Sequence, residues 1–182
     1  LVAAFATRAG RAPGLGLVLV GDDPASHVYV RNKIRSGMEV GFHVDLRHLP
    51  ASTPLETMLG EVARLNHSAT HDGFLVQSPL PHALGDEAER MVFDAIDPSK
   101  DVDGFSPQSV GRLVQKRPTL MACTPAGIVE LLDRYEIPIA GRHAVVIGRS
   151  DIVGKPMALM LLHRDATVTI CHSKTRDLPA VA

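Results

Sequence analysis

Short apolar runs alternate with helix-forming segments along this chain, and that rhythm limits the folds that it can adopt. Runs typical of β-strands, bounded by glycine, proline or polar turns, lie at residues 15–20, 42–49, 73–77, 144–147 and 166–171. Segments with helical periodicity or helix-start signals separate most of them. Strands that alternate with helices at this spacing predict an α/β fold with a mostly parallel sheet.

The rhythm is interrupted once, which predicts two domains. Residues 94–106 are expected to form a loop, and residues 115–123 are the best candidate for a boundary. We therefore predict one α/β domain over residues 1–122 and a second over residues 123–182. The pattern opens on what are interpreted as the last turns of a helix and stops before the next strand, so the second domain is expected to be incomplete.

The composition argues against several classes of protein. The chain carries 19 Lys and Arg against 20 Asp and Glu, and this balance argues against nucleic-acid binding through phosphate neutralisation. No apolar run approaches the ~20 residues that cross a bilayer, so no membrane partner is expected. Two cysteines cannot build a disulfide framework, which favours a reducing compartment and a cytoplasmic location.

Tyr29 and Lys33 stand four residues apart in a segment predicted to be helical. This spacing puts a phenol and an ammonium group on one helix face, where both can reach the same substrate. Lysine works as a general acid or base only where burial or a positive neighbour lowers its pKa toward neutrality. Spacing alone favours an ordinary amphipathic helix with Tyr29 half-buried and Lys33 in water.

Gln77 and Asp103 are further candidates for contacts with a ligand. Gln77 ends a predicted strand, and ligands of open parallel sheets bind beyond the carboxyl ends of the strands. The pattern around Gln77 fits a ligand contact and a simple proline-closed loop about equally. Asp103 lies two residues after Asp101, a spacing that suits binding of a cation or hydrogen bonds to a polar heterocycle, although spacing alone favours a solvated turn.

A glycine loop at residues 148–156 connects a β-branched strand to a predicted helix. Such a loop offers backbone N–H groups and a positive helix end to a pyrophosphate, although its G-x5-G spacing departs from the G-x-G-x-x-G fingerprint. Gly148, Arg149 and Ser150 converge there, and Arg149 suits the ribose 2′-phosphate that distinguishes NADP from NAD. Ser173 lies in a second polar segment after the next strand, where recognition of the adenosine ribose is expected.

The histidines do not suggest a metal site in the sequence. His67 and His71 have a spacing that metal binding tolerates, but no HExxH motif or carboxylate partner accompanies them. All nine histidines are therefore interpreted as surface residues, and no metal is expected.

Taken in order, these motifs closely resemble the bifunctional methylenetetrahydrofolate dehydrogenase/methenyltetrahydrofolate cyclohydrolase family over residues 14–182. The segments that carry the resemblance are VGDDPASHVYVxxK at 20–33, GFLVQxPLP at 73–81, KDVDGF at 100–105, CTP at 123–125 and GRSxxVGxP at 148–156. The resemblance implies two α/β domains flanking a cleft, the second being a Rossmann-like NADP-binding domain. It also implies a homodimer.

The resemblance assigns roles to the candidates in the first domain. It implies that Lys33 is the catalytic lysine of the folate cleft and that Gln77 hydrogen-bonds and tunes it. Tyr29 would line the cleft beside the pterin and aminobenzoate portions, and Asp103 would anchor the pterin ring. Ser78 stands where the family usually has a leucine, which is expected to wet the pocket wall slightly and to leave Gln77 in place.

The resemblance also implies that Gly148, Arg149, Ser150 and Ser173 bind NADP. The implied activity is NADP-dependent oxidation of 5,10-methylenetetrahydrofolate to 5,10-methenyltetrahydrofolate, followed by hydrolysis to 10-formyltetrahydrofolate. The alternatives are a relative that keeps only one of these activities and a non-catalytic folate- or nucleotide-binding module.

Overall fold

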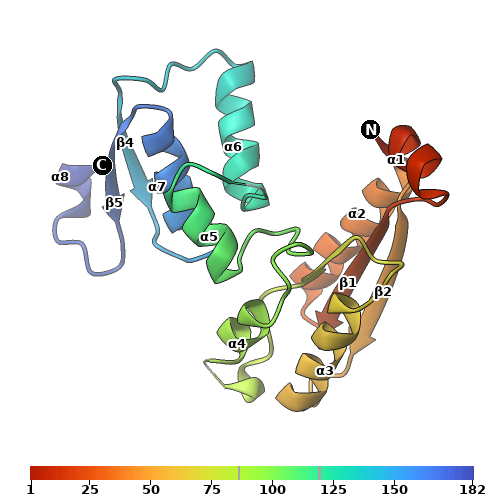
Figure 1. Ribbon diagram of the computed structural model, residues 1–182. Coiled ribbons are helices and arrows are strands. Elements are labelled where there is room, and N and C mark those ends of the chain that lie inside the picture. Colours follow the sequence, from red (N-terminus) through yellow and green to blue (C-terminus); the bar gives the residue numbers. More distant parts are fainter. Residues whose placement is uncertain (86, 119) are drawn as a thin grey trace. The chain divides into compact units, whose positions relative to one another are not determined.

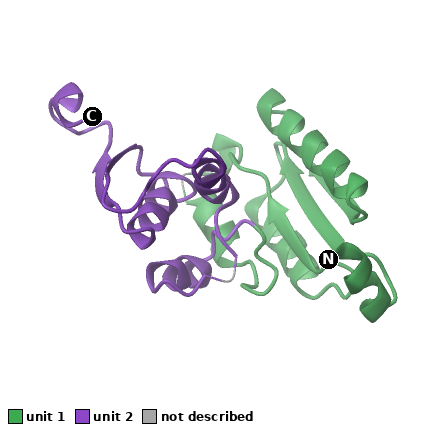
Figure 2. Cartoon of the chain, turned by 90° about the horizontal axis from the view of Figure 1, so that it is seen from above, with its two compact units in different colours: residues 1–102 green, residues 103–182 purple. Residues whose placement is uncertain are grey.

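The computed structural model describes residues 1–85, 87–118 and 120–182, and it divides into two compact units (Figure 1). The first unit is Leu1–Val102 and the second is Asp103–Ala182, as coloured in Figure 2. Both units alternate helices with strands, and every strand pairing within the sheets of the described residues is parallel. The predicted α/β class with parallel sheets is therefore confirmed.

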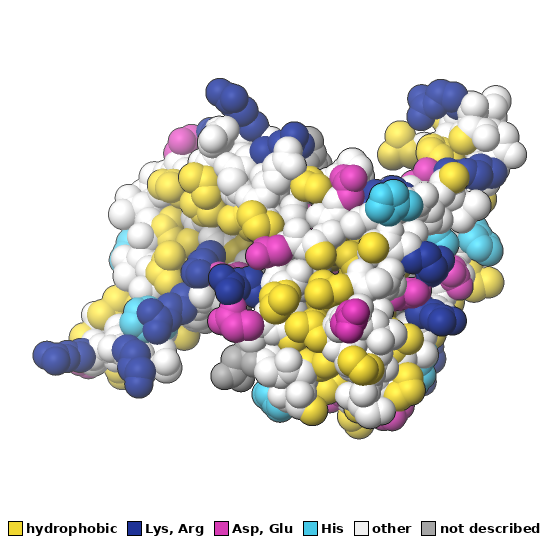
Figure 3. Space-filling view, turned by 60° about the horizontal axis from the view of Figure 1, so that its bottom comes forward, with side chains coloured by type: hydrophobic (Ala, Val, Ile, Leu, Met, Phe, Trp, Pro, Cys, Tyr) yellow, Lys and Arg dark blue, Asp and Glu magenta, His cyan; other side chains and the backbone are white. Residues whose placement is uncertain are grey.

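The helices and the surface charges relate to the predictions about membrane and nucleic-acid partners. Within the described residues, no helix combines the length and the apolar character needed to cross a membrane. Basic and acidic side chains both lie among hydrophobic ones on the face shown in Figure 3, in keeping with the near-equal numbers of the two charges in the sequence.

The first unit is built around a three-stranded parallel sheet in the order β2-β1-β3. Its strands are β1 (Gly14–Val20), β2 (His43–Leu49) and β3 (Gly73–Val76). Its helices are α1 (Val2–Ala9), α2 (Pro24–Glu39), α3 (Leu55–Asn66) and α4 (Ala88–Asp94), with a 3-10 turn at His82–Leu84. β1 pairs on both edges and is buried along nearly its whole length, because it is the central strand.

Apolar side chains of β1 form the core of this unit. Leu17 and Leu19 are fully buried with Val30 of α2 and Leu75 of β3. Helix α2 starts directly after β1, where the Asp23 carboxylate accepts a hydrogen bond from the backbone N–H of Ser26. This cap satisfies an otherwise unpaired donor of the first turn and fixes where α2 begins relative to the sheet.

An ion pair fixes the start of β1. The Arg11 guanidinium donates to both carboxylate oxygens of Asp72 at 2.7 and 2.8 Å, and the backbone N–H of Gly14 donates to the same carboxylate at 2.8 Å. These bonds hold the pKa of Asp72 below its usual value, with the hydrogen bond from Arg11 as the largest cause. Position 14 needs a glycine, since a Cβ there would lie 1.9 Å from the carbonyl oxygen of Thr70.

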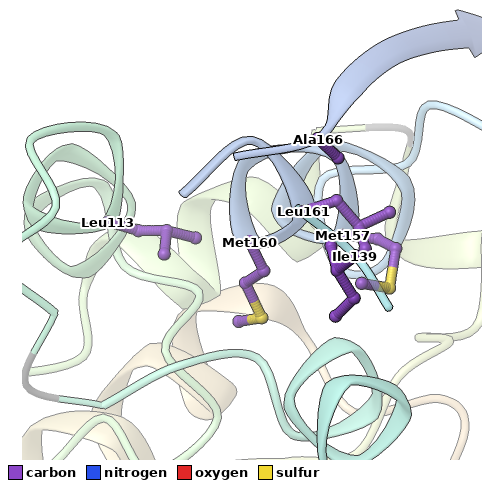
Figure 4. Close-up of a cluster of buried hydrophobic side chains, with 6 residues drawn as sticks. All are labelled: Leu113, Ile139, Met157, Met160, Leu161 and Ala166. Atoms are coloured by element: carbon purple, nitrogen blue, oxygen red, sulfur yellow. The ribbon is translucent and has the colours of Figure 1, made fainter. Parts of the chain in front are cut away.

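The second unit holds a two-stranded parallel sheet and a helical layer. Its strands are β4 (His143–Ile147) and β5 (Thr167–Cys171), and its helices are α5 (Pro107–Val114), α6 (Cys123–Arg134), α7 (Gly154–His163) and α8 (Leu178–Val181). The core gathers on α7, whose buried side chains pack with Leu113 of α5 and with Ile139 and Ala166 (Figure 4). The side chains from α7 are Met157, Met160 and Leu161.

The structure differs from the sequence expectations for one helix and for one histidine. Helix α5 lies where no element was predicted, although Ser106 and Pro107 give a normal start signal and the Ser106 hydroxyl accepts from the backbone N–H of Ser109. The interpretation of all histidines as surface residues is wrong for His71, which is buried with its Nδ1 2.7 Å from the Ser68 hydroxyl.

The division between the two units lies before the predicted domain boundary at 122/123. Packing separates the units between Val102 and Asp103, so residues 103–122 are described with the second unit. The boundary at 122/123 stays a prediction, and residue 119 of the predicted boundary segment lies outside the described residues.

Truncating the central strand should destabilise the first unit far more than truncating its neighbour. Leu17 pairs in register with Leu46 of β2, but Leu17 is 0% exposed and Leu46 is 38% exposed. We expect Leu17→Ala to lower the free energy of unfolding by about 2–5 kcal/mol and Leu46→Ala by less than about 1 kcal/mol. Urea unfolding of the two variants measures both values, and equal losses would contradict this description of the core.

Candidate functional site

Lys33 and Gln77 are brought together by the parallel pairing of β1 with β3. Helix α2 follows the carboxyl end of β1, and Gln77 follows the carboxyl end of β3, so both leave the same edge of the sheet. The backbone N–H of Gln77 continues the pairing by donating to the carbonyl of Val18 at 2.8 Å. As a result, the half-buried Lys33 Nζ donates to the Gln77 Oε1 at 3.1 Å.

The amide of Gln77 is oriented by its own backbone neighbour. Its Nε2 donates to the carbonyl oxygen of Ser78 at 2.6 Å, so the other end of the amide presents its oxygen to Lys33. The Ser78–Pro79 peptide bond is cis. An amide held at its N–H₂ end has little freedom to turn, and the acceptor for the lysine ammonium is therefore fixed in place.

Glu89 of α4 holds this turn and was not identified from the sequence. Its carboxylate accepts from the Ser78 hydroxyl at 2.9 Å and from the backbone N–H of Leu80 at 3.2 Å. The Ser78 hydroxyl, expected to wet the pocket wall, is thus engaged with Glu89. The only sequence signal for this contact was the hydroxyl at position 78, because nothing local shows which distant carboxylate a turn will meet.

Tyr29 lies on the same side of α2 as Lys33. Four residues correspond to about 400° of helical rotation, so the two side chains point within about 40° of each other. Tyr29 is 60% exposed, more than the half-buried position that spacing alone favoured. An exposed ring beside a fixed lysine is a surface on which a flat ligand can stack.

Asp103 is the first residue of the second unit and is described with that unit. The Sγ of Cys123 lies 3.9 Å from its Oδ1, as a weak hydrogen-bond donor. The structure thus joins Lys33 and Gln77 within the first unit and puts Tyr29 on the same side of α2 as Lys33, and the assignment of Tyr29 and Asp103 to one site with them stays a prediction.

The second candidate site lies at the carboxyl ends of β4 and β5. These strands are parallel and in register up to Ile147 and Cys171, and the backbone N–H of Gly148 donates to the carbonyl of Cys171 at 2.8 Å. The loop that carries Arg149 and the loop that carries Ser173 therefore leave the same edge of the sheet. Both of those side chains are exposed.

The glycines of the first loop allow it to pass very close to the start of α7. Gly148 has φ +137°, a conformation that favours glycine. A Cβ at Gly154 would lie 2.4 Å from the carbonyl oxygen of Gly148, so only a glycine fits there. The loop is thus folded tightly over the helix N-terminus, where an anion would meet the positive end of the helix dipole.

Ser150 caps α7 and keeps a donor for a ligand. Its hydroxyl oxygen accepts from the backbone N–H groups of Val153 and Gly154, both at 3.2 Å. A serine hydroxyl that accepts two bonds still has its O–H to donate. This hydroxyl, the cationic Arg149 and the N-terminus of α7 form a donor set that fits the phosphates of a dinucleotide.

Comparison with known proteins identifies a family model for each part of the chain. The model described as "Tetrahydrofolate dehydrogenase/cyclohydrolase, catalytic domain" matches residues 2–103. The model described as "Tetrahydrofolate dehydrogenase/cyclohydrolase, NAD(P)-binding domain" matches residues 122–182.

Similar proteins match the chain over nearly its whole length. "Bifunctional protein FolD" of Chlorobium phaeobacteroides is 49% identical over 98% of this chain and 62% of its own length. The protein of the same name from Lacticaseibacillus casei is 54% identical over 93% of this chain and 59% of its own length. The chain therefore spans about three fifths of the curated relatives that it matches.

Solved structures resemble both the sequence and the fold. The bifunctional enzyme FolD of Campylobacter jejuni gives a TM-score of 0.89 at 41% identity, over 97% of this chain and 62% of that one. The Trypanosoma brucei enzyme, solved with NADP cofactor and an inhibitor, gives a TM-score of 0.91 at 36% identity, over 99% of this chain and 60% of that one.

An added methyl group at position 154 should disrupt the second site. We expect Gly154→Ala to push the loop away from α7 and to weaken NADP binding by about tenfold or more. The new methyl group would meet the backbone carbonyl oxygen of Gly148, which cannot rotate away as a side chain could. Gly127→Ala is the matched control: position 127 lies within α6, a Cβ there meets nothing within 4 Å, and helix propensity favours alanine by about 1 kcal/mol. Titration with NADP tests both variants, and unchanged binding by Gly154→Ala would contradict the description of this loop.

Proposed function

Because the chain belongs to the tetrahydrofolate dehydrogenase/cyclohydrolase family, we propose that it acts on one-carbon derivatives of tetrahydrofolate. The proposed reactions are NADP-dependent oxidation of 5,10-methylenetetrahydrofolate to the 5,10-methenyl cation, and hydrolysis of that cation to 10-formyltetrahydrofolate. The observation that supports this most strongly is the 3.1 Å hydrogen bond from Lys33 to Gln77 in the unit that matches the catalytic-domain model.

In the proposed hydrolysis, Lys33 moves protons. Water adds to the amidinium-like carbon and loses a proton, which the neutral amine of Lys33 can accept at Nζ. The ring then opens as the bond from this carbon to N5 breaks, and N5 takes a proton that the Lys33 ammonium can return. The hydroxyl of the adduct loses its own proton to the Lys33 amine as the formyl C=O forms, and that proton passes to water, so one proton is released overall. Gln77 holds Nζ through both steps by accepting one of its hydrogens, and Glu89 keeps the turn behind Gln77 in place.

Tyr29 and Asp103 bind the folate in this proposal. The exposed ring of Tyr29, on the same side of α2 as Lys33, would stack beside the pterin and aminobenzoate portions. The Asp103 carboxylate would accept hydrogen bonds from the pterin. Fixing the one-carbon bridge in this way lowers the barrier mainly through orientation.

The donor set at the carboxyl ends of β4 and β5 would hold NADP. When bound, this cofactor supplies the acceptor for the hydride. Gly148 lets the backbone approach the pyrophosphate, Ser150 donates its hydroxyl, and Arg149 pairs with the 2′-phosphate, while Ser173 lies where the ribose is recognised. A homodimer in the cytoplasm completes the proposal: the family resemblance supports the homodimer, and the low cysteine content of the chain supports the location.

Replacing Lys33 should separate the two activities. We expect Lys33→Met to slow hydrolysis of the methenyl cation by about 100-fold or more and to change NADP affinity by less than about threefold, because general acid–base catalysis contributes 10²–10⁴-fold. Decay of the methenyl absorbance and NADP titration give the two values. Arg35→Met on the same helix, 67% exposed at its side chain, is the matched control and should leave both unchanged. Equal losses of both properties in the folded Lys33 variant would reject its role in proton transfer.

Arg149 should determine the preference between NADP and NAD. We expect Arg149→Ala to weaken NADP binding by about tenfold or more, since a charge-assisted hydrogen bond to the 2′-phosphate is lost, and to leave NAD binding unchanged. Titration of wild type and variant with each dinucleotide measures the change. Arg142→Ala, an exposed arginine just before β4, should alter neither affinity. Equal binding of both dinucleotides by the wild type would show that the proposed contact is absent.

The same assays separate the alternative functions. Formation of NADPH from methylenetetrahydrofolate reports the dehydrogenase, and decay of the methenyl chromophore reports the cyclohydrolase. One signal without the other would indicate a relative with a single activity. Binding of folate or dinucleotide without either signal would indicate a binding module.

A further inference from the structure

Two histidines and an aspartate meet at the carboxyl ends of β1 and β2 in the first unit, and none of them belongs to the candidate site described above. Asp22 follows β1, His27 lies in the first turn of α2, and His48 lies near the end of β2. One ligand atom from each residue lies within 4.8 Å of the other two. The parallel pairing of β1 with β2 creates this cluster, since it places position 48 beside the turn that follows β1.

The distances within the cluster suit a small metal ion. The Asp22 Oδ1 lies 3.5 Å from the His27 Nε2 and 3.4 Å from the His48 Nε2. Ligands at about 2.0–2.1 Å from a tetrahedral zinc ion are separated by about 3.4 Å, so both distances match an edge of that tetrahedron. The imidazole rings are perpendicular with centroids 5.2 Å apart, and both side chains are about two-fifths exposed, which gives them room to turn toward one ion.

Of the two adjacent aspartates, Asp22 supplies the carboxylate of the cluster. Asp23 is engaged as the cap of α2 through the backbone N–H of Ser26. The His48 Nε2 also lies 2.9 Å from the carbonyl oxygen of Gly21, to which it can donate a proton. Metal binding at this nitrogen requires that proton to reside on Nδ1 instead, which is the other neutral tautomer of the ring.

We propose that Asp22, His27 and His48 form a binding site for a late first-row divalent metal ion, with zinc as the best fit. Two imidazoles and one carboxylate are a normal ligand set for this ion, and a water molecule can complete the tetrahedron. His27 and Tyr29 lie about 200° apart around α2, so the ion would lie on the far side of the helix from the proposed folate site. The metal is therefore structural: it ties the end of β2 to the start of α2. It is independent of the proposed function.

Zinc titration of the 182-residue chain tests this site. We expect one high-affinity ion per chain in competition with a chromophoric zinc indicator, and a Tm about 5–10 °C higher at a hundredfold excess of zinc over Kd. Asp22→Asn, His27→Gln and His48→Gln should each weaken binding by about tenfold or more. Cobalt bound at the same site should show the visible absorption of a tetrahedral ion, and this absorption should be lost in the same three variants.

Two control variants define the site. His43→Gln removes an exposed histidine from the same strand as His48 but outside the cluster, and it should bind zinc as the wild type does. Cys123→Ser removes the exposed thiol, a competing zinc ligand, and should also leave the affinity unchanged. The Tm without metal shows whether each variant is folded. Absence of stoichiometric binding, or binding that survives all three cluster substitutions, would overturn the proposal and leave the cluster as an ion-pair network.

Discussion

The parallel pairing of β1 with its two neighbours is the constraint on which the first unit depends. Pairing with β3 brings Gln77 to the helix that follows β1, and so places an amide oxygen 3.1 Å from the Lys33 ammonium. Pairing with β2 brings His48 to the turn between β1 and α2. Both clusters of polar side chains thus arise at the carboxyl ends of strands, where backbone geometry leaves an edge open to ligands.

Apolar packing and polar contacts have different roles in the first unit. The buried leucines of β1 hold the sheet together, whereas Asp72, Asp23 and Glu89 fix the positions of chain segments at its ends. Each of these carboxylates accepts a backbone N–H, so each satisfies a donor that the strands and helices leave unpaired. Stability and the geometry of the proposed site are therefore supplied largely by different residues.

The sequence predicted the parts of the structure that depend on local signals. The apolar run at 15–20 corresponds to β1, because burial on both faces of a strand requires such a run. The run at 144–147 corresponds to β4, which is only partly buried. Local pattern made Lys33 and Gln77 separate candidates, but only the family resemblance implied their hydrogen bond, which is a contact across 44 residues that local pattern does not reveal. Glu89 and the His27–His48 pair were missed for the same reason. Helix α5 was missed despite its Ser106–Pro107 start signal, because the segment before it, residues 94–106, was predicted to be a long loop.

The central claim is that Gln77 holds the Lys33 amine in position for proton transfer. The most direct test is the rate of methenyltetrahydrofolate hydrolysis by wild type and by Gln77→Leu, followed as decay of the methenyl absorbance across a range of pH. The account predicts that the protein accelerates the decay, and that Gln77→Leu slows it and changes its pH dependence while the chain stays folded. A variant with the rate and pH profile of the wild type would contradict the account.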